Sequence, residues 1–268
     1  MGFYFNRCVK KGHWGTAMWG QLKHFSHQLI GRFKTWRIMT QWQDTDMVSL
    51  ARIRHSALKN VHQIGIIGDS VSFGLKAKYN YGQYIQKATG ATVQNLAVSG
   101  AHLADNGFTS IFQQAQRLDP ADLYIVQGTD DDWLGDIPIG GPTDLTATTY
   151  IGAFYQIIAH LRQRQPQATI IVLTPTYQTP VRGQQVRRTD RTLNGLGLDL
   201  HAYVAAQLAA CQDLAVPVIN LMQKKRFDPS QADFRAQVMP DGLHPNDVGQ
   251  RRIARLIAET YTKIIKAK

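Results

Sequence analysis

The stretch IGIIGDSVSFG, residues 64–74, decides how the rest of the chain is interpreted. Residues 64–67 form a short apolar run bounded by glycine, which predicts a buried strand. Gly68-Asp69-Ser70 follows at once, and a tight turn there would lift the Ser70 hydroxyl off the carboxyl end of the strand. A serine in that place is either a helix N-cap or a nucleophile, and these three residues alone favour the N-cap.

Apolar runs and helical patterns alternate from residue 63 to the end of the chain. Strands are expected at 64–67, 93–98, 122–126, 168–174 and 216–221, and helices at 74–89, 104–117, 148–165, 198–212 and 245–265. Continuous apolar strands that alternate with helices predict a parallel sheet covered on both faces. Such sheets bind ligands beyond the carboxyl ends of their strands, where Ser70, Gly100, Asp130 and the loop after Thr174 are expected.

The charge of the chain is unevenly distributed. The net charge is +11, and residues 1–60 carry ten Lys and Arg against two Asp. We therefore divide the chain into a basic N-terminal extension at 1–60, partly helical or disordered, and one main domain at 61–268. The main domain is only mildly basic, so we expect no nucleic-acid partner for it.

Three interpretations of the extension stay open. Residues 18–36 have an apolar face at helical spacing among basic residues, which would suit peripheral contact with an anionic membrane. Packing on the main domain or on a second copy is an alternative, and so is a true start at Met39 or Met47. No apolar run is long enough to span a membrane and no secretory signal is seen, so we expect a cytoplasmic protein.

A second informative stretch, DGLHPN at residues 241–246, stands just before the last expected helix. Gly-Asp-Ser after a strand, followed about 170 residues later by Asp-x-x-His before a helix, resembles the SGNH hydrolases, also called GDSL-type esterases and lipases. The resemblance runs from about residue 61 to the C-terminus. It implies a three-layer α/β/α sandwich with a flavodoxin-like parallel sheet, and it implies no cofactor.

By this resemblance Ser70 is the nucleophile, His244 the general base and Asp241 the residue that orients the histidine. The assignment makes chemical sense because a serine hydroxyl needs an adjacent base to attack a carbonyl, and an imidazolium needs a carboxylate beside it. Of nine histidines, only His244 has this setting. Taken without the resemblance, each residue alone favours a structural role: Asp241 as a helix N-cap or turn acid, and His244 as a solvent-facing loop residue.

Acyl transfer also requires donors for the oxyanion. The resemblance assigns the backbone N–H of Ser70, the backbone N–H of Gly100 and the side chain of an asparagine in a Gly-x-Asn-Asp motif. Here Gly128-Thr129-Asp130-Asp131 puts Asp130 at the asparagine position. An ionised carboxylate only accepts hydrogen bonds, although a protonated one can donate. We therefore expect a weakened catalyst and predict that Asp130→Asn raises kcat on a simple ester.

The sequence thus predicts a serine esterase that cleaves a carboxylic ester, acyl or acetyl, through an acyl-serine intermediate. A weakly active or non-catalytic binding protein, and an acyltransferase on the same triad, remain alternatives. Acetylated sugars, short acyl esters and lysophospholipids all stay open as small-molecule, carbohydrate or lipid substrates. No metal site is expected from Asp130-Asp131-Asp132, since adjacent acids rarely point at one ion. The loop arginines are either a solvated face or contacts for an anionic substrate: Arg182, Arg187, Arg188 and Arg191.

Overall fold

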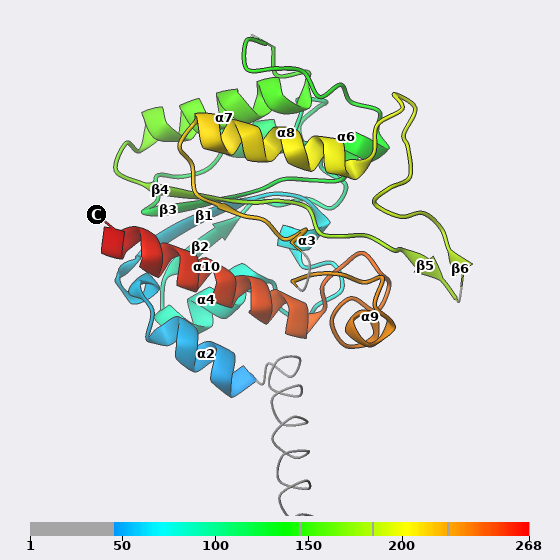
Figure 1. The fold of residues 1–268 in the computed structure, drawn as a ribbon. Coiled ribbons are helices and arrows are strands. Elements are labelled where there is room, and N and C mark those ends of the chain that lie inside the picture. Colours follow the sequence, from blue (N-terminus) through cyan, green and yellow to red (C-terminus); the bar gives the residue numbers. More distant parts are fainter. Residues whose placement is uncertain (1–45, 145, 184, 224–225, 268) are drawn as a thin grey trace, which may run out of the picture. The chain divides into compact units, whose positions relative to one another are not determined.

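A central sheet of five parallel strands forms the middle layer of the protein (Figure 1). The computed structural model describes residues 46–144, 146–183, 185–223 and 226–267. The strand order β2-β1-β3-β4-β7 is the flavodoxin-like order that was expected. The strands are β1 (Gln63–Ile67), β2 (Thr92–Asn95), β3 (Leu123–Gln127), β4 (Thr169–Leu173) and β7 (Val218–Ile219).

Helices cover both faces of this sheet, so the predicted α/β/α sandwich is confirmed. One layer contains α5 (Ile111–Gln116), α7 (Tyr150–Arg164) and α8 (Leu200–Asp213), and the other contains α2 (Asp46–Arg54), α4 (Tyr81–Thr89) and α10 (Asp247–Ala267) (Figure 1). Every residue of β3 and β4 is buried. Strands covered on both faces need apolar side chains at each position, which is why these segments are continuous apolar runs.

Several short elements were not predicted individually from the sequence. They are η1 (Ala57–Asn60), α3 (Ser70–Phe73), α6 (Asp131–Leu134), α9 (Ala232–Val238) and the hairpin of β5 (Val181–Arg182) with β6 (Gln185–Val186). The elements α3, α6, α9 and the hairpin gather beyond the carboxyl ends of the strands (Figure 1). This edge therefore holds much of the irregular chain of the domain, and the candidate site is built there.

The helix expected at residues 74–89 is shorter, because helix α4 begins only at Tyr81 and residues 74–80 form turns after α3. Gly74 ends α3 in a left-handed conformation with φ of +86°, which a residue with a side chain adopts only with strain. Asn80 then starts α4 through a reciprocal capping box with Gln83. The helix expected at 104–117 is also shorter, because Ser110 caps α5 immediately before Ile111.

The folded unit reaches further toward the N-terminus than the boundary predicted between residues 60 and 61, since it already contains α2. The side chains of Ile53 and Leu58 are fully buried, and α2 packs against α4 and α10. Sequence periodicity missed this because α2 has little contrast between an apolar and a polar face. The helix expected at residues 18–36, with its proposed membrane contact, lies outside the described residues.

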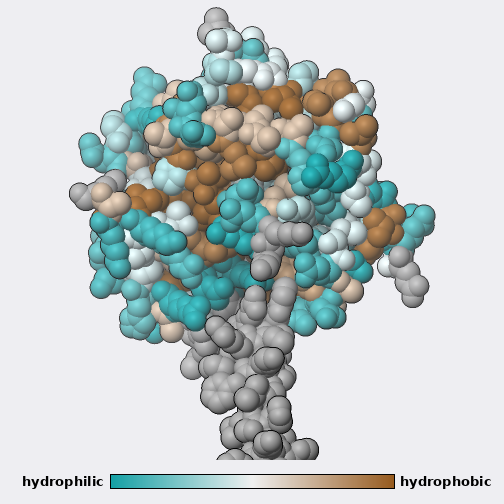
Figure 2. Space-filling model, in the orientation of Figure 1, coloured by the Kyte–Doolittle hydropathy of each residue, from teal (hydrophilic) through white to brown (hydrophobic). Residues whose placement is uncertain are grey.

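The two helical layers present different surfaces on the face shown in Figure 2. Hydrophilic side chains cover most of the region around α10, whereas hydrophobic ones gather over α8 (Figure 2). The outer positions of α8 include the exposed Ala205 and Ala209. None of the described helices has both the length and the apolar character that crossing a bilayer requires.

Candidate active site

Ser70 stands at the first position of α3, two residues after Gly68 and directly beyond β1. The N-cap of α3 is Asp69, whose Oδ1 accepts a hydrogen bond from the N–H of Val71 at 2.7 Å. The Ser70 hydroxyl is therefore not needed as a helix cap, which was the structural alternative left open by the sequence. It lies instead 3.1 Å from Nε2 of His244.

Two buried glutamines hold the turn that carries Ser70. Oε1 of Gln127, at the end of β3, accepts from the N–H groups of Asp69 and Ser72 and from the Ser72 hydroxyl, at 3.2, 3.1 and 2.8 Å. The side-chain amide of Gln114 binds both the N–H and the C=O of Gly68, at 2.9 and 3.1 Å. Neither glutamine was predicted from the sequence; the available signal was a glutamine ending the apolar strand β3. These buried hydrogen bonds rigidify the turn that carries Ser70.

Gly68 is required at this turn because the glutamine clasp approaches it closely. A Cβ atom there would lie 2.6 Å from Oγ of Ser72 and 2.7 Å from Oε1 of Gln127. Any side chain would therefore push apart the groups that orient Ser70. The glycine is explained by close packing rather than by an unusual backbone angle.

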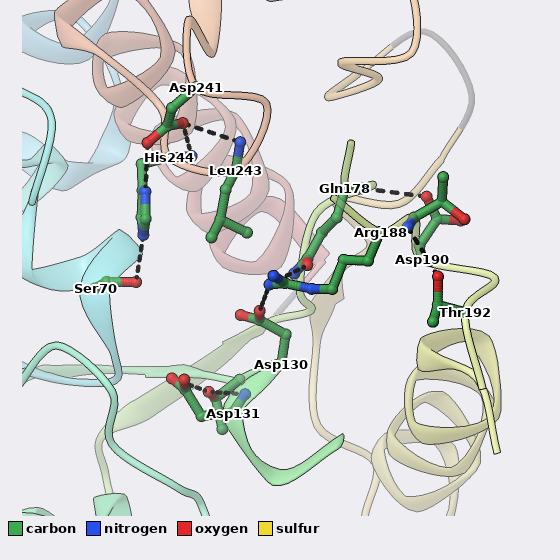
Figure 3. Close-up of polar contacts among 12 residues, drawn as sticks. Ser70, Asp130, Asp131, Gln178, Arg188, Asp190, Thr192, Asp241, Leu243 and His244 are labelled. Atoms are coloured by element: carbon green, nitrogen blue, oxygen red, sulfur yellow. Dashed lines mark hydrogen bonds and ion pairs between the residues drawn. The ribbon is translucent and has the colours of Figure 1, made fainter. Parts of the chain in front are cut away.

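His244 links Ser70 to Asp241 through a continuous set of hydrogen bonds (Figure 3). Nδ1 of His244 lies 2.7 Å from Oδ2 of Asp241, while Oδ1 of Asp241 accepts from the N–H groups of Leu243 and His244 at 3.0 and 2.8 Å. A carboxylate at Nδ1 favours the tautomer with its proton there, which leaves the Nε2 lone pair facing the Ser70 hydroxyl. Asp241 thus caps its own turn and orients the ring at once.

Burial alone would raise the pKa of Asp241, but hydrogen bonds from the His244 ring and from the backbone N–H groups of His244 and Leu243 lower that pKa to about 2. Asp241 is consequently ionised throughout the neutral range. Its negative charge is available to stabilise an imidazolium at His244.

The loop that carries Asp241 is fastened to the segment after β4. The Thr179 N–H donates to the C=O of Gly242 at 2.9 Å, and the Val181 N–H donates to the C=O of Asp241 at 3.0 Å. Gly242 has φ of +74°, and a Cβ atom there would lie 1.9 Å from the carbonyl oxygen of Thr179. Only glycine fits both the backbone angle and this contact.

The predicted backbone donors, Ser70 and Gly100, lie in adjacent segments. The Val98 N–H donates to the C=O of Gly68 at 3.1 Å, which keeps the chain after β2 beside the chain after β1. Gly100 follows two residues later in a left-handed conformation, with φ of +80°. Within the described residues, no hydrogen bond occupies the backbone N–H of Ser70 or of Gly100. Both groups therefore remain open to an oxyanion.

Asp130 stands at the start of α6, and its side chain makes no capping hydrogen bond there. Its side chain is almost completely buried, and its Oδ2 lies 3.7 Å from Nη2 of Arg188. Figure 3 shows Arg188 reaching toward Asp130 from the side of the site opposite Ser70 and His244. In the sequence Arg188 is one of four equivalent loop arginines, and the structure separates it from the others.

The other three loop arginines stay near the surface. Arg182 and Arg187 are exposed, and the exposed Arg191 pairs with Asp199 at 3.0 Å. Arg188 alone turns inward, where its guanidinium carbon lies 5.7 Å from the centre of the Trp133 ring. One residue of the loop therefore belongs to the site, and no periodicity in the sequence distinguishes it.

Three carboxyl groups converge below the site. Asp69, Asp130 and Asp131 each offer an oxygen, and these oxygens lie within 4.8 Å of one another. The expectation that adjacent acids would not point together is therefore wrong for Asp130 and Asp131. It holds for Asp132, whose carboxylate turns away to accept from the N–H groups of Leu103 and Ala104.

This cluster could hold a hard cation, but positive charge already stands beside it in Arg188. Burial, and then the neighbouring Asp130, raise the pKa of Asp131 to about 7. Burial raises the pKa of Asp69 well above its ordinary range, and Asp130 and Asp131 raise it further. Proton uptake is therefore a second way in which the cluster limits its own charge.

The chain matches one family model, that of the GDSL-like lipase/acylhydrolase family, over residues 66–252. The search of curated proteins found no match. One solved crystal structure is 28% identical, with a TM-score of 0.69 over 78% of this chain and 99% of its own.

Two further solved structures share the fold at lower identity. A possible lipase from Chitinophaga pinensis is 19% identical, with a TM-score of 0.61 over 76% of this chain and 99% of its own. A carbohydrate acetylesterase family member from Sinorhizobium meliloti is 14% identical, with a TM-score of 0.51 over 76% and 99%. These similarities are similarities of fold: a five-stranded parallel sheet between two helical layers.

Proposed function

This chain belongs to the GDSL-like lipase/acylhydrolase family and is an ester-hydrolysing enzyme, and we propose that it works through a Ser70-His244-Asp241 triad and an acyl-serine intermediate. The observation that carries the proposal is the unbroken contact from Asp241 Oδ2 through both ring nitrogens of His244 to the Ser70 hydroxyl, at 2.7 and 3.1 Å. Ser70 is the first residue of α3, whereas Asp241 and His244 lie on the loop between α9 and α10, near the other end of the domain sequence.

In the acylation step, Oγ of Ser70 attacks the ester carbonyl carbon while Nε2 of His244 takes the hydroxyl proton. The carbonyl electron pair moves onto oxygen and forms an oxyanion. When that pair returns, the bond from carbon to the alcohol oxygen breaks, and His244 gives its proton to the departing alkoxide. Water then repeats the sequence on the acyl-serine, with His244 again as base and then as acid.

The oxyanion is held in part by the backbone N–H groups of Ser70 and Gly100. Both are free of other acceptors among the described residues, and both lie where parallel strands end. Preorganised backbone donors are effective because they need no reorganisation during the reaction. Asp130 contributes no amide donor, so this oxyanion hole has two backbone donors of its own.

We infer a carboxylic ester with a short acyl group as substrate, with the alcohol drawn from a sugar or a lipid. Support comes from relatives named as a possible lipase and as a carbohydrate acetylesterase family member. The walls of the site come from loops, and loops set specificity in enzymes of shared fold.

The test is hydrolysis of p-nitrophenyl acetate and butyrate by the full chain between pH 5 and 9, together with Ser70→Ala. We expect turnover that falls by roughly 10⁶-fold in the variant, because removal of a triad nucleophile leaves only binding and oxyanion contributions. A fluorophosphonate probe should label the wild type at Ser70 and leave the variant unlabelled.

Circular dichroism of Ser70→Ala provides the control, since the hydroxyl is not a helix cap and its loss should leave the fold intact. Turnover that survives in the folded variant would contradict the triad. Absence of both turnover and labelling in the wild type would favour a binding protein that retains the family fold. Transfer of the acyl group to an added alcohol in preference to water would favour an acyltransferase.

A further inference from the structure

Arg188 is a cationic side chain of the site that the proposed triad does not use. It lies two residues after β6 and reaches back to the start of α6, where its Nη2 faces Oδ2 of Asp130 at 3.7 Å (Figure 3). Its side chain is largely buried, and the guanidinium carbon stands 5.7 Å from the centre of the Trp133 ring. Burying a cation costs free energy, which a nearby negative charge or a functional role must offset.

The guanidinium keeps unused hydrogen-bond donors. Nη2 donates to Oε1 of Gln178 at 3.3 Å, while 3.7 Å to Asp130 exceeds hydrogen-bond distance. Nε is buried and has no acceptor among the described residues. Arginine carries five N–H donors, so a ligand oxygen at this place would meet donors that are already desolvated.

The presence of Asp130 explains why unused donors of Arg188 would matter at this site. It occupies the position at which the Gly-x-Asn-Asp pattern has an amide, and a carboxylate there opposes negative charge on the substrate instead of binding it. A positive charge beside Asp130 cancels that opposition. The substitution at position 130 and the inward turn of Arg188 are thus two parts of one electrostatic arrangement.

We propose that Arg188 supplies the positive charge that stabilises the oxyanion in this enzyme, in place of the missing amide donor. The inference rests on the proposed serine esterase mechanism. Arg188 keeps its protons throughout: the carbonyl electron pair moves onto oxygen as the Ser70 Oγ–carbon bond forms, the guanidinium faces that charge, and the pair returns as the alkoxide leaves.

Hydrogen bonds of the neighbouring backbone fix the position of Arg188. The N–H of Arg187 donates to the C=O of Pro180 at 2.9 Å, which closes the hairpin next to the Val181 contact with the Asp241 loop. Oδ1 of Asp190 accepts from the N–H of Gln178 at 3.2 Å, and Gln178 in turn holds Nη2 of Arg188. The segment from residue 178 to residue 190 therefore both carries Arg188 and makes hydrogen bonds to the Asp241 loop.

An anionic substrate group is the competing partner for Arg188. The carboxyl groups of Asp130 and Asp131 both interact electrostatically with the Arg188 guanidinium. The pocket therefore holds no excess positive charge that would attract an anionic group of the substrate. A transient oxyanion needs only local compensation, which Arg188 provides. The arrangement therefore favours the reaction intermediate over an anionic ground state.

The experiment is a double-mutant cycle on p-nitrophenyl acetate, a neutral ester, with Arg188→Met, Asp130→Asn and the combined variant. We expect Arg188→Met to lower kcat by about 10²-fold with little change in KM, which is the loss typical of one oxyanion donor. Asp130→Asn should raise kcat, and the combined variant should recover to within about ten-fold of the wild type, because an amide again faces the oxyanion. Arg187→Met, which alters the exposed neighbour, is the matched control and should leave kcat unchanged.

Two further readouts separate this role from a purely structural one. Phenylboronic acid forms an anionic tetrahedral adduct with a catalytic serine, so its inhibition should weaken in Arg188→Met by the same factor as kcat/KM. Added guanidinium should partly restore the kcat of that variant, and thermal unfolding should show it folded at the assay temperature. Boronate binding that is unchanged in folded Arg188→Met would overturn the inference.

A loss in Arg188→Met that appears only in KM for anionic esters would also overturn it, and would assign Arg188 to substrate recognition. Fluorophosphonate labelling keeps the two proposals apart. If the wild type is labelled at Ser70 and Arg188→Met retains wild-type kcat, the inference about Arg188 fails alone. If the wild type shows neither labelling nor Ser70-dependent turnover, the proposed function itself fails.

Discussion

Ser70, His244 and Asp241 are joined by hydrogen bonds of 3.1 and 2.7 Å, whereas Asp130 and Arg188 face each other across 3.7 Å on the other side of the site. We call the first group, to which the proposed mechanism assigns proton transfer, the nucleophile side, and the second, proposed to stabilise the oxyanion, the oxyanion side. The nucleophile side is fully engaged, because the Asp241 carboxylate accepts from both the ring and the backbone. The oxyanion side keeps an unused donor at Nε of Arg188, which has no acceptor among the described residues.

This difference shows which part of the site can vary. Proton transfer along the nucleophile side depends on short, directed contacts, so each partner must keep both its type and its place. Electrostatic stabilisation acts over longer distances and can be provided by an amide, a backbone N–H or a guanidinium. A departure from the family pattern is consequently more tolerable at Asp130 than at Ser70 or His244.

The largest expected effect beyond Ser70→Ala lies on the nucleophile side. Asp241→Asn should lower kcat by about 10⁴-fold, because an amide at Nδ1 of His244 permits the wrong tautomer. The measurement is kcat on p-nitrophenyl acetate, with Asp233→Asn on the exposed surface of α9 as the control. A kcat within ten-fold of the wild type would mean that Asp241 only caps its turn.

A smaller effect on kcat is expected from the contact of Gly242 with Thr179, which connects the two sides of the site. Gly242→Ala should lower kcat by about 10- to 100-fold and lower the melting temperature, because its Cβ would collide with the Thr179 carbonyl and shift the Asp241 loop. Gly90→Ala is the matched control, since Gly90 has φ of +82° but a Cβ added there would meet nothing within 4 Å.

Gly90→Ala should therefore lose stability, by roughly 1 kcal/mol from backbone strain, while kcat stays at the wild-type value. Equal losses of kcat in the two glycine variants would show that the left-handed conformation matters and the Thr179 contact does not. In that case the nucleophile and oxyanion sides would be independent of each other.

The smallest effect concerns the charge balance below the oxyanion side. Burial and Asp130 raise the pKa of Asp131 to about 7, against roughly 4 in an unfolded chain. Between those values the folded state keeps a proton that the unfolded state has lost, so Asp131 reduces stability progressively as pH rises through this window. Asp131→Asn should remove that loss.

The gain in unfolding free energy of Asp131→Asn should be near zero at pH 4, grow up to pH 7 and level off above it at a few kcal/mol at most. Urea unfolding at pH 4, 5.5, 7 and 8 measures it, with Asp233→Asn as the exposed control. A gain that is constant with pH would show that Asp131 is not protonated in the folded protein.

Much of the fold was accessible from the sequence because its signals are local. Apolar runs such as 122–126 and 168–174 become β3 and β4, and their burial on both faces requires that composition. The triad candidates were accessible for a related reason, since Ser70 and His244 each stand in a short motif next to a predicted element. The exact ends of helices such as α4 were not, because caps at Gly74 and Asn80 override the apolar pattern.

The sequence by itself determined the layered parallel sheet, the edge at which the site lies and the departure at Asp130. Only the tertiary structure decided that Asp69, not Ser70, caps α3, that Gln114 and Gln127 hold the turn around Ser70, and that Arg188 alone among the four loop arginines turns inward. Periodicity reports which face of an element is buried, and motifs report residues close in sequence. Contacts such as Arg188 with Asp130 join loops whose paths depend on packing of the whole domain, so no local pattern encodes them.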